Sequence, residues 1–395
     1  MKNDKNKTKK KRAIALAGGG PAAGLHIGVL KALEDAGIDF DIYTLSCIGA
    51  WVGIVYNTRT PPNRAEQTLA FFRDQCFRDD ASFSWFPINR GFAADMQAQW
   101  KAWAAFPFSN RREWQHLVQP KEIGQGVTNT MKLATDPSRW TPQQFNAWML
   151  NDVLAVNPFT RYMTSLIYNA EINGLSKVYY DDSPVLAEVF REGRLFADDA
   201  PEIYHNAWRL PKEGVDGAPG TPGRMQIFHN RPQKFGKGER DYLKIQPKSL
   251  CACSALPYIE ESVVIDGDEY TEGALVDTVN FKNLLRDHPD LDEVWVNRIV
   301  DDSQVRPART LADSLANLPM QFAAEVGEND IKLFRQHLIN QTRMRPRVVE
   351  VPIVPDTMVN FEWKRSNLMR GYEEGQQAIQ ALLRADPQLR ESTLA

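Results

Sequence analysis

This 395-residue sequence contains few cysteines and has a low net charge. Its four cysteines are too few for a disulfide framework at this length, so we expect reduced thiols in a cytoplasmic protein. A formal net charge of −3 argues against nucleic-acid binding, because binding driven by overall charge needs many uncompensated Lys and Arg side chains. With 43% hydrophobic and 25% charged residues, the composition is that of a globular protein.

The sequence also lacks an apolar run suited to a membrane span. The uncharged stretch over residues 13–30 follows a basic segment and has the length of a span or signal peptide. It contains five glycines and one proline, and a helix interior loses about 1 kcal/mol for each Gly and about 3 kcal/mol for Pro. We therefore expect a folded segment there. Residues 1–12 predict a basic disordered tail, either solvated or in contact with an anionic membrane.

What the first sixty residues do contain is an alternation of strand and helix patterns. Residues 13–17 predict a short buried strand, followed by the loop Gly18, Gly19 and Gly20 and by a helix that Gly37 closes at its C′ position. Residues 41–45 predict a second strand, and an apolar helix over 48–56 follows directly. This order is typical of the start of a parallel α/β sheet.

The rest of the chain predicts a helical insertion and then a return of strands. Residues 58–160 are rich in aromatics, which either fill the core of the insertion or face lipid. The other predicted elements are strands at 164–168, 177–180, 293–299 and 348–353, a hairpin at 263–265 and 269–271, a surface loop at 211–223, and helices near 248–256, 310–342 and 366–384. We expect one α/β domain over 13–385 and a C-terminal tail over 386–395.

The glycine loop can bind an anion, because its backbone N–H groups can approach a ligand at the positive start of a helix. The ligand could be a phosphate or the oxyanion of an acyl-transfer intermediate. A P-loop is excluded, since Leu-His follows Gly24 where Lys-Ser/Thr is required.

A dinucleotide-binding oxidoreductase is an open alternative. Gly18 and Gly20 followed by Ala23 fit the fingerprint of such enzymes, and Asp39 and Asp41 lie at about the right distance. These acids precede the second strand, however, whereas the ribose-binding acid should end it.

Cys47 lies where the second strand joins its helix. A side chain at such a turn is exposed at the top of the sheet, as in a nucleophile elbow, and Gly49 and Ala50 keep the crossing with the neighbouring helix small. The helix start would favour a thiolate. The alternative is a buried, inert cysteine. Ser46 is a poor substitute nucleophile, because it would point to the opposite side of the strand.

Glu272 is a candidate general base. It is followed by Gly273-Ala274 directly after a predicted strand, where a tight turn can project its carboxylate into a cleft. The alternative is a solvated acid. None of the six histidines lies in a comparable motif.

Together these segments resemble the patatin-like phospholipase family. That family combines a glycine-rich oxyanion loop, a Gly-x-Ser-x-Gly elbow, and an Asp-Gly-Gly/Ala segment preceded by Ala-Ser-x-Ala-x-Pro and Ile-Asp-Gly-x-x-Tyr. The corresponding segments here are residues 18–33, 47–50 and 252–276. The resemblance implies a patatin-like three-layer α/β fold with a mainly parallel sheet and a nucleophile elbow.

The resemblance also implies a lipid acyl hydrolase that works without cofactor or metal. Carried over, Cys47 is the nucleophile, Glu272 is the base, and Gly18, Gly19 and Gly20 form the oxyanion hole. The implied partner is a lipid or other acyl ester, with peripheral contact to a membrane or lipid surface, while the oligomeric state stays open.

Three positions depart from the family pattern. Leu45 stands where the elbow normally begins with Gly, Cys47 replaces Ser, and Glu272 replaces Asp. A thiol ionises more readily than a hydroxyl, although a nearby carboxylate raises its pKa. A thioester intermediate also favours acyl transfer to acceptors other than water. Retained hydrolysis, acyltransferase character, an engineered Cys47, and a catalytically impaired lipid-binding or scaffold protein are all open.

Overall fold

The computed structural model describes residues 10–91, 96–108, 117–169, 172, 174–177, 183–190, 193–214, 220–235, 241–281, 283–300, 302–305, 307–340, 345–352 and 362–390. The chain forms two compact units, the first made of residues 1–93 and 176–395 and the second of residues 94–175. Each unit is described by itself.

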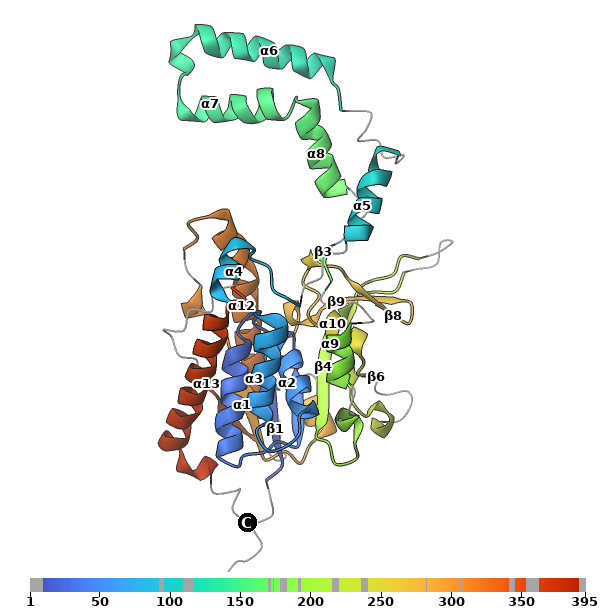
Figure 1. Cartoon of the computed structure of the whole chain (residues 1–395), viewed down its shortest axis with the longest axis vertical. Coiled ribbons are helices and arrows are strands. Elements are labelled where there is room, and N and C mark those ends of the chain that lie inside the picture. The colour runs from blue at the N-terminus through green and yellow to red at the C-terminus, as the bar shows by residue number, and fades with distance from the viewer. Residues whose placement is uncertain are drawn as a thin grey trace, which may run out of the picture. The chain divides into compact units, whose positions relative to one another are not determined.

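The first unit alternates strands and helices along most of its length (Figure 1). Its strands are β1 (Arg12–Leu16), β2 (Ile42–Leu45), β4 (Glu202–Arg209), β5 (Arg224–His229), β6 (Leu243–Lys244), β7 (Tyr258–Glu260), β8 (Val263–Ile265), β9 (Asp268–Glu272), β10 (Glu293–Asn297) and β11 (Arg347–Glu350). Its helices are α1 (Ala23–Asp35), α2 (Ile48–Thr58), α3 (Arg64–Phe71), α4 (Asp80–Trp85), α9 (Pro184–Phe190), α10 (Pro247–Ala252), α11 (Leu284–Asp287), α12 (Leu311–Asn340) and α13 (Arg365–Ala385).

The central sheet has the strand order β11-β10-β1-β2-β4-β5-β6. The strands from β11 to β4 are parallel, β4 and β5 are antiparallel, and β9 pairs antiparallel with β4 and β8. The predicted α/β fold with a mainly parallel sheet is confirmed. The predicted hairpin is present as β8 and β9, and positive φ angles at Asp266 and Gly267 make its two-residue turn.

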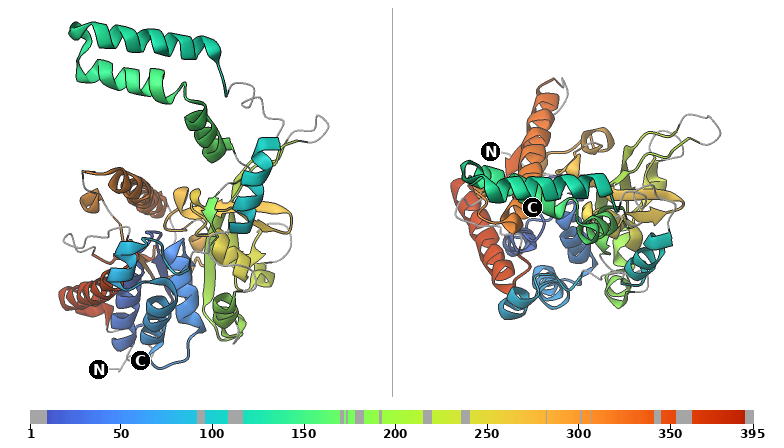
Figure 2. Two further views of the ribbon diagram at one scale, coloured as in Figure 1. Left: turned by 45° about the horizontal axis from the view of Figure 1, so that its top comes forward. Right: turned by 90° about the horizontal axis from the view of Figure 1, so that it is seen from above.

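Helices cover both faces of the sheet (Figures 1 and 2). On β1, Ile14 and Leu16 belong to one buried cluster with side chains of α1, α2 and α13. The alternate residues, including Ala13 and Ala15, belong to a second cluster with the C-terminal half of α12. Because successive side chains of a strand point to opposite faces, this alternation produces the expected three layers.

Close packing of α1 on α13 depends on glycine. A Cβ at Gly28 would lie 2.0 Å from the Tyr372 carbonyl oxygen, and a Cβ at Gly375 would lie 2.4 Å from the Leu25 carbonyl oxygen. At the end of α1, Gly37 has a φ of 67°, which confirms its predicted C′ position.

Both predicted tails include residues that pack in the first unit. Arg12 begins β1 and is buried, with its guanidinium donating to Glu293 at 2.9 Å, while Lys10 reaches the same carboxylate at 2.6 Å. At the other end Leu389 is fully buried and its carbonyl accepts from Arg12 at 3.4 Å. The buried Glu293 needs cationic partners, and this requirement orders the segment around Arg12. Residues 1–9 and 391–395 lie outside the described residues.

The described part of the second unit is mostly helical, with α5 (Met96–Ala105), α6 (Pro120–Thr135), α7 (Pro142–Trp148) and α8 (Pro158–Asn169), followed by the short strand β3 (Gly174–Ser176). The unit begins near residue 94, whereas the predicted insertion begins near 58, because α3 and α4 belong to the first unit. Within the described residues, no helix is both long and apolar enough to cross a membrane.

The predicted strand at 164–168 is wrong, since these residues belong to α8. The Asn157 side chain accepts hydrogen bonds from the Phe159 and Thr160 amides at 2.8 and 3.3 Å, and Pro158 occupies the first helical position. This helix start outweighs the β-propensity of the following apolar residues. The partner strand predicted at 177–180 lies mostly outside the described residues. The helix predicted at 248–256 is shorter, as α10 ends at Ala252.

Candidate active site

Cys47 occupies a strained turn between β2 and α2. Its φ of 48° and ψ of −122° are rare for a residue with a side chain, and such strain is typical of functional turns. Gly49 permits the turn, because a Cβ there would lie 2.1 Å from the Leu16 carbonyl oxygen. The predicted sharp turn from strand to helix is therefore present. Ser46 instead donates to Asn206 at 2.9 Å.

Leu45 fits at the start of this turn because of Gly53. Leu45 is fully buried, and a Cβ at Gly53 would lie 2.5 Å from a Leu45 methyl carbon. A glycine on the facing helix thus provides the space that the leucine side chain requires. The turn can therefore begin with leucine where the family pattern has glycine.

Glu272 lies at the end of β9 and is 6% exposed, so it is not a solvated acid. Its amide donates to the Ala255 carbonyl at 3.0 Å, and Glu272 pairs with Ala207 of β4. At the following residue, a Cβ on Gly273 would lie 3.0 Å from the backbone of Ala207. These contacts bring the carboxyl group to Cys47, although the two residues are far apart in the sequence.

The two side chains affect each other's protonation. Burial raises the pKa of the Glu272 carboxyl to about 7, and a hydrogen bond with the Cys47 thiol offsets part of this rise. Burial also raises the pKa of the Cys47 thiol well above its usual value, and the Glu272 charge and hydrogen bond raise it further. The Ile48 amide lowers the thiol pKa, but this effect is outweighed. The helix start thus acts in the expected direction, but burial and Glu272 outweigh it, and the net shift of the thiol pKa is upward.

The glycine loop passes beside Cys47. A Cβ at Gly18 would lie 2.9 Å from the Ala274 Cβ and 3.2 Å from the Cys47 Cβ, so a side chain there would fill the space next to the sulfur. The Gly18 amide donates to the Thr278 carbonyl at 3.2 Å. It is therefore occupied, which argues against the predicted role of Gly18 as an oxyanion donor. Among the described residues, the amides of Gly19 and Gly20 have no acceptor.

His26 anchors the start of this loop through two buried hydrogen bonds. Its Nε2 donates to the Ala17 carbonyl at 2.9 Å, and its Nδ1 accepts from the Asn297 amide group at 2.8 Å. Burial lowers the pKa of His26 to about 4, so the ring is neutral. None of the described histidines lines the pocket that contains Cys47.

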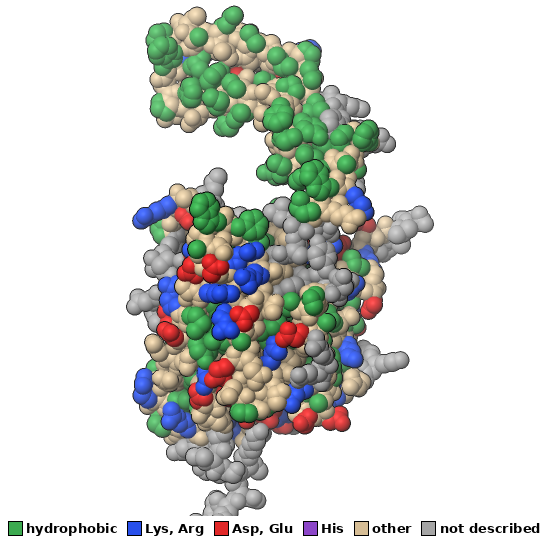
Figure 3. All heavy atoms as spheres, viewed as in Figure 1, with side chains coloured by type: hydrophobic (Ala, Val, Ile, Leu, Met, Phe, Trp, Pro, Cys, Tyr) green, Lys and Arg blue, Asp and Glu red, His purple; other side chains and the backbone are tan. Residues whose placement is uncertain are grey.

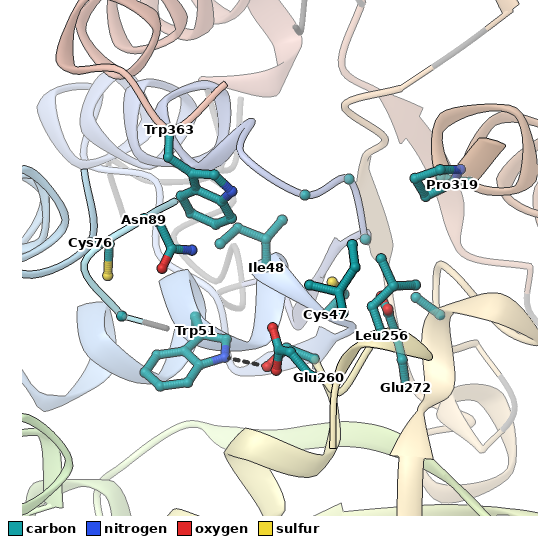
Figure 4. Close-up of a pocket in the computed structure, with 18 of the residues that line it drawn as sticks. Cys47, Ile48, Trp51, Cys76, Asn89, Leu256, Glu260, Glu272, Pro319 and Trp363 are labelled. Atoms are coloured by element: carbon teal, nitrogen blue, oxygen red, sulfur yellow. Dashed lines mark hydrogen bonds between the residues drawn. The ribbon is translucent and has the colours of Figure 1, made fainter. Parts of the chain in front are cut away.

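One pocket of the first unit contains Cys47, Glu272 and the glycine loop (Figure 4). The rest of its lining is mainly apolar and includes Ile48, Trp51, Phe72, Leu256, Ile259, Met320 and Trp363. Within the part of the chain that the structure describes, no Lys, Arg or His lines it, and no group of three or more His, Cys, Asp or Glu side chains could hold a metal ion. Such a pocket suits a hydrocarbon chain better than an anionic ligand.

Three residues of the pocket lining were not predicted from the sequence, namely Trp51, Glu260 and Trp363. The Trp51 indole donates to the Ser254 hydroxyl at 3.0 Å (Figure 4). Trp51 could have been found from its place one helical turn after Ile48. Glu260 and Trp363 carry no local sequence signal that marks them as pocket residues.

Residues 14–285 match the family model of patatin-like phospholipases. The chain belongs to the patatin-like phospholipase family. Over 55 residues it is 42% identical to patatin-like phospholipase domain-containing protein 6 of Mus musculus, Pongo abelii and Homo sapiens. That match covers 14% of this chain and 4% of each relative.

Among solved structures, VipD from Legionella pneumophila aligns with 95% of this patatin-like chain and 67% of its own, at 10% identity and a TM-score of 0.33. A similarity this low adds nothing to the assignment. The dinucleotide alternative gains no support, because β2 ends at Leu45 without an acid and Asp41 accepts from the Arg12 amide at 2.9 Å. The family supports a lipid hydrolase in general terms.

Proposed function

We propose that this patatin-like chain hydrolyses lipid acyl esters with Cys47 as nucleophile and Glu272 as general base. The proposal is carried by a strained cysteine that contacts a buried carboxyl inside an apolar pocket, which Gly19 and Gly20 also line. The raised pKa of Glu272 suits a group that must both accept and return a proton near neutral pH.

The proposed reaction has two halves. Glu272 accepts the thiol proton as the Cys47 sulfur attacks the ester carbonyl, and the resulting oxyanion accepts hydrogen bonds from the Gly19, Gly20 and Ile48 amides. The C–O bond then breaks, Glu272 returns the proton to the leaving alcohol, and a thioester remains on Cys47. In the second half, water attacks the thioester while Glu272 takes its proton. The carboxylic acid product then leaves, and Glu272 returns the proton to the Cys47 sulfur.

The scheme predicts an acyl thioester on Cys47, and detecting this intermediate tests it. Incubation with a p-nitrophenyl ester should add one acyl mass to the peptide that contains Cys47, and hydroxylamine should remove it. Adding an alcohol acceptor then separates hydrolysis from acyl transfer, since transfer yields a new ester in place of free acid. A protein that forms no adduct would be a lipid-binding or scaffold member of the family.

Hydrolysis should depend on pH through Glu272. Only the ionised carboxylate accepts the thiol proton, and burial places its pKa at about 7. We therefore expect kcat/KM to rise about tenfold per pH unit below pH 7 and to level off above it. Initial rates with a neutral chromogenic ester between pH 5 and 9 measure this dependence. Activity that falls between pH 6 and 8 would contradict the role of Glu272 as a base.

We also propose that the second unit contacts a lipid surface. Large hydrophobic side chains of its helices are exposed, with Trp100, Trp140 and Phe159 each more than 60% exposed. Of the two alternatives left open for the aromatics, filling the core of the insertion does not hold for these three. On the face drawn in Figure 3, hydrophobic side chains of this unit lie among few charged ones. Trp is favoured at membrane interfaces, and an acyl hydrolase must extract its substrate from a lipid aggregate.

Vesicle flotation tests this contact. The double variant Trp100→Ala/Phe159→Ala should lower the bound fraction of full-length protein on phosphatidylcholine vesicles at least about fivefold, because two large apolar side chains no longer enter the interface. The exposed Gln143→Ala variant on α7 serves as the control and should bind as the wild type does. Equal binding of all three proteins would refute the proposed surface.

A further inference from the structure

Glu260 is a second buried carboxyl in the pocket. It ends β7, is 4% exposed, and lines the same cavity as Cys47 and Glu272 (Figure 4). Its backbone position is held by its amide, which donates to the Leu256 carbonyl at 2.9 Å. The proposed hydrolysis assigns no task to this side chain.

Within the described residues, no donor or cation contacts the Glu260 carboxyl. The neighbouring polar groups are satisfied, since the Trp51 indole donates to Ser254 and the Ser254 hydroxyl donates to the Cys251 carbonyl at 3.2 Å. A buried polar group without a partner costs stability, so such a group in a pocket indicates a ligand that completes its hydrogen bonds.

The protonation state of Glu260 follows from its surroundings. Burial raises the pKa of Glu260 well above its usual value, and the Glu272 charge raises it further. Glu272 must ionise to act as a base, and two adjacent carboxylates would repel each other. The protonated form of Glu260 is therefore favoured, and in this form the side chain presents one O–H donor and one carbonyl acceptor.

We propose that Glu260 is a specificity-determining residue that binds an uncharged hydroxyl group on the alcohol portion of the substrate. The inference rests on the proposed function and identifies its substrate class as neutral hydroxyl-bearing acyl esters such as monoacylglycerols. A hydroxyl both donates and accepts, and so matches a protonated carboxyl. An anionic phosphate is disfavoured, because the lining holds two carboxyls and, among its described residues, no cation to neutralise a buried negative charge.

Matched esters of one fatty acid test this preference. The substrates are monodecanoylglycerol, its 3-phosphate and ethyl decanoate, each used below its aggregation concentration with the full chain. Wild type should hydrolyse monodecanoylglycerol with a kcat/KM at least about 100-fold above that of the phosphate. The Glu260→Leu variant should lose about tenfold on monodecanoylglycerol and stay within about twofold on ethyl decanoate, which has no hydroxyl. Glu260→Gln keeps a donor and an acceptor and should restore most of the loss.

Calorimetric binding of 1-O-decylglycerol, an ether that cannot be hydrolysed, makes the inference testable without turnover. Glu260→Leu should weaken this binding about tenfold and leave that of decyl ethyl ether unchanged. Equal losses on both ligands, or a preference for the phosphate ester, would overturn the role of Glu260. If the Cys47→Ala variant kept the turnover of the wild type, the proposed function would be refuted instead. Binding of the ether would still test the role of Glu260.

Discussion

Cys47→Ala should lower kcat/KM for ester hydrolysis by a factor of about 10³ or more. Cys47 contacts the proposed base in a pocket that Gly19 and Gly20 also line, and alanine leaves no atom that can form the acyl bond. Hydrolysis of p-nitrophenyl decanoate and intact-mass detection of the acyl adduct measure the two consequences. Both signals should disappear together, because the adduct is the intermediate of the reaction.

Two variants control this experiment. Cys251 is buried outside the pocket lining, so Cys251→Ala should keep both the activity and the adduct. Cys47→Ser retains a nucleophilic atom at the turn and should keep measurable hydrolysis while losing reaction with thiol reagents. Full activity in Cys47→Ala would exclude covalent catalysis at this residue.

Glu272→Gln should lower kcat/KM by about 10²–10⁴, the range expected when a general base is removed. The same change should make Cys47 more reactive toward iodoacetamide at pH 8, because the Glu272 charge and hydrogen bond raise the pKa of the thiol. Because misfolding would also expose the buried Cys47 thiol, the gain in reactivity counts only for a variant that still melts cooperatively. Glu269→Gln on the same strand is the control, since Glu269 lies outside the pocket lining and should affect neither measurement.

Glu272→Gln should raise the stability of the folded protein at pH 8, although it lowers the activity. The folded pKa of Glu272 is about 7 and its usual value is 4.5, so the folded state binds the proton more tightly. The stabilisation is complete below pH 4.5 and is lost as the pH rises through 7. Glu272→Gln cannot ionise and should therefore melt near the wild-type temperature at pH 4.5 and above it at pH 8. Calorimetry at both pH values measures the difference, and a lower melting temperature at pH 8 would contradict the assigned ionisation.

Local sequence pattern was enough for the elements that surround Cys47. Gly18, Gly37 and Gly49 mark a loop, a helix end and a tight crossing, respectively. Gly37 has a positive φ angle, and a Cβ at Gly18 or Gly49 would clash with neighbouring atoms. The hairpin that contains Glu272 could likewise be predicted, because an Asp-Gly turn separates its two short strands. The same kind of pattern failed at 164–168, where the cap at Asn157 starts a helix.

The sequence by itself determined the α/β fold of the core, the strand-to-helix turn at Cys47 and the family to which the chain belongs, because each can be recognised from patterns within short segments and from the order of those segments. Only the tertiary structure decided that the Gly18 amide is occupied, that burial and Glu272 raise the pKa of the Cys47 thiol, and that Glu260 lines the pocket. The physical reason is that burial and electrostatic environment are set by side chains from distant strands and helices, whereas turns and periodicity are set by neighbours.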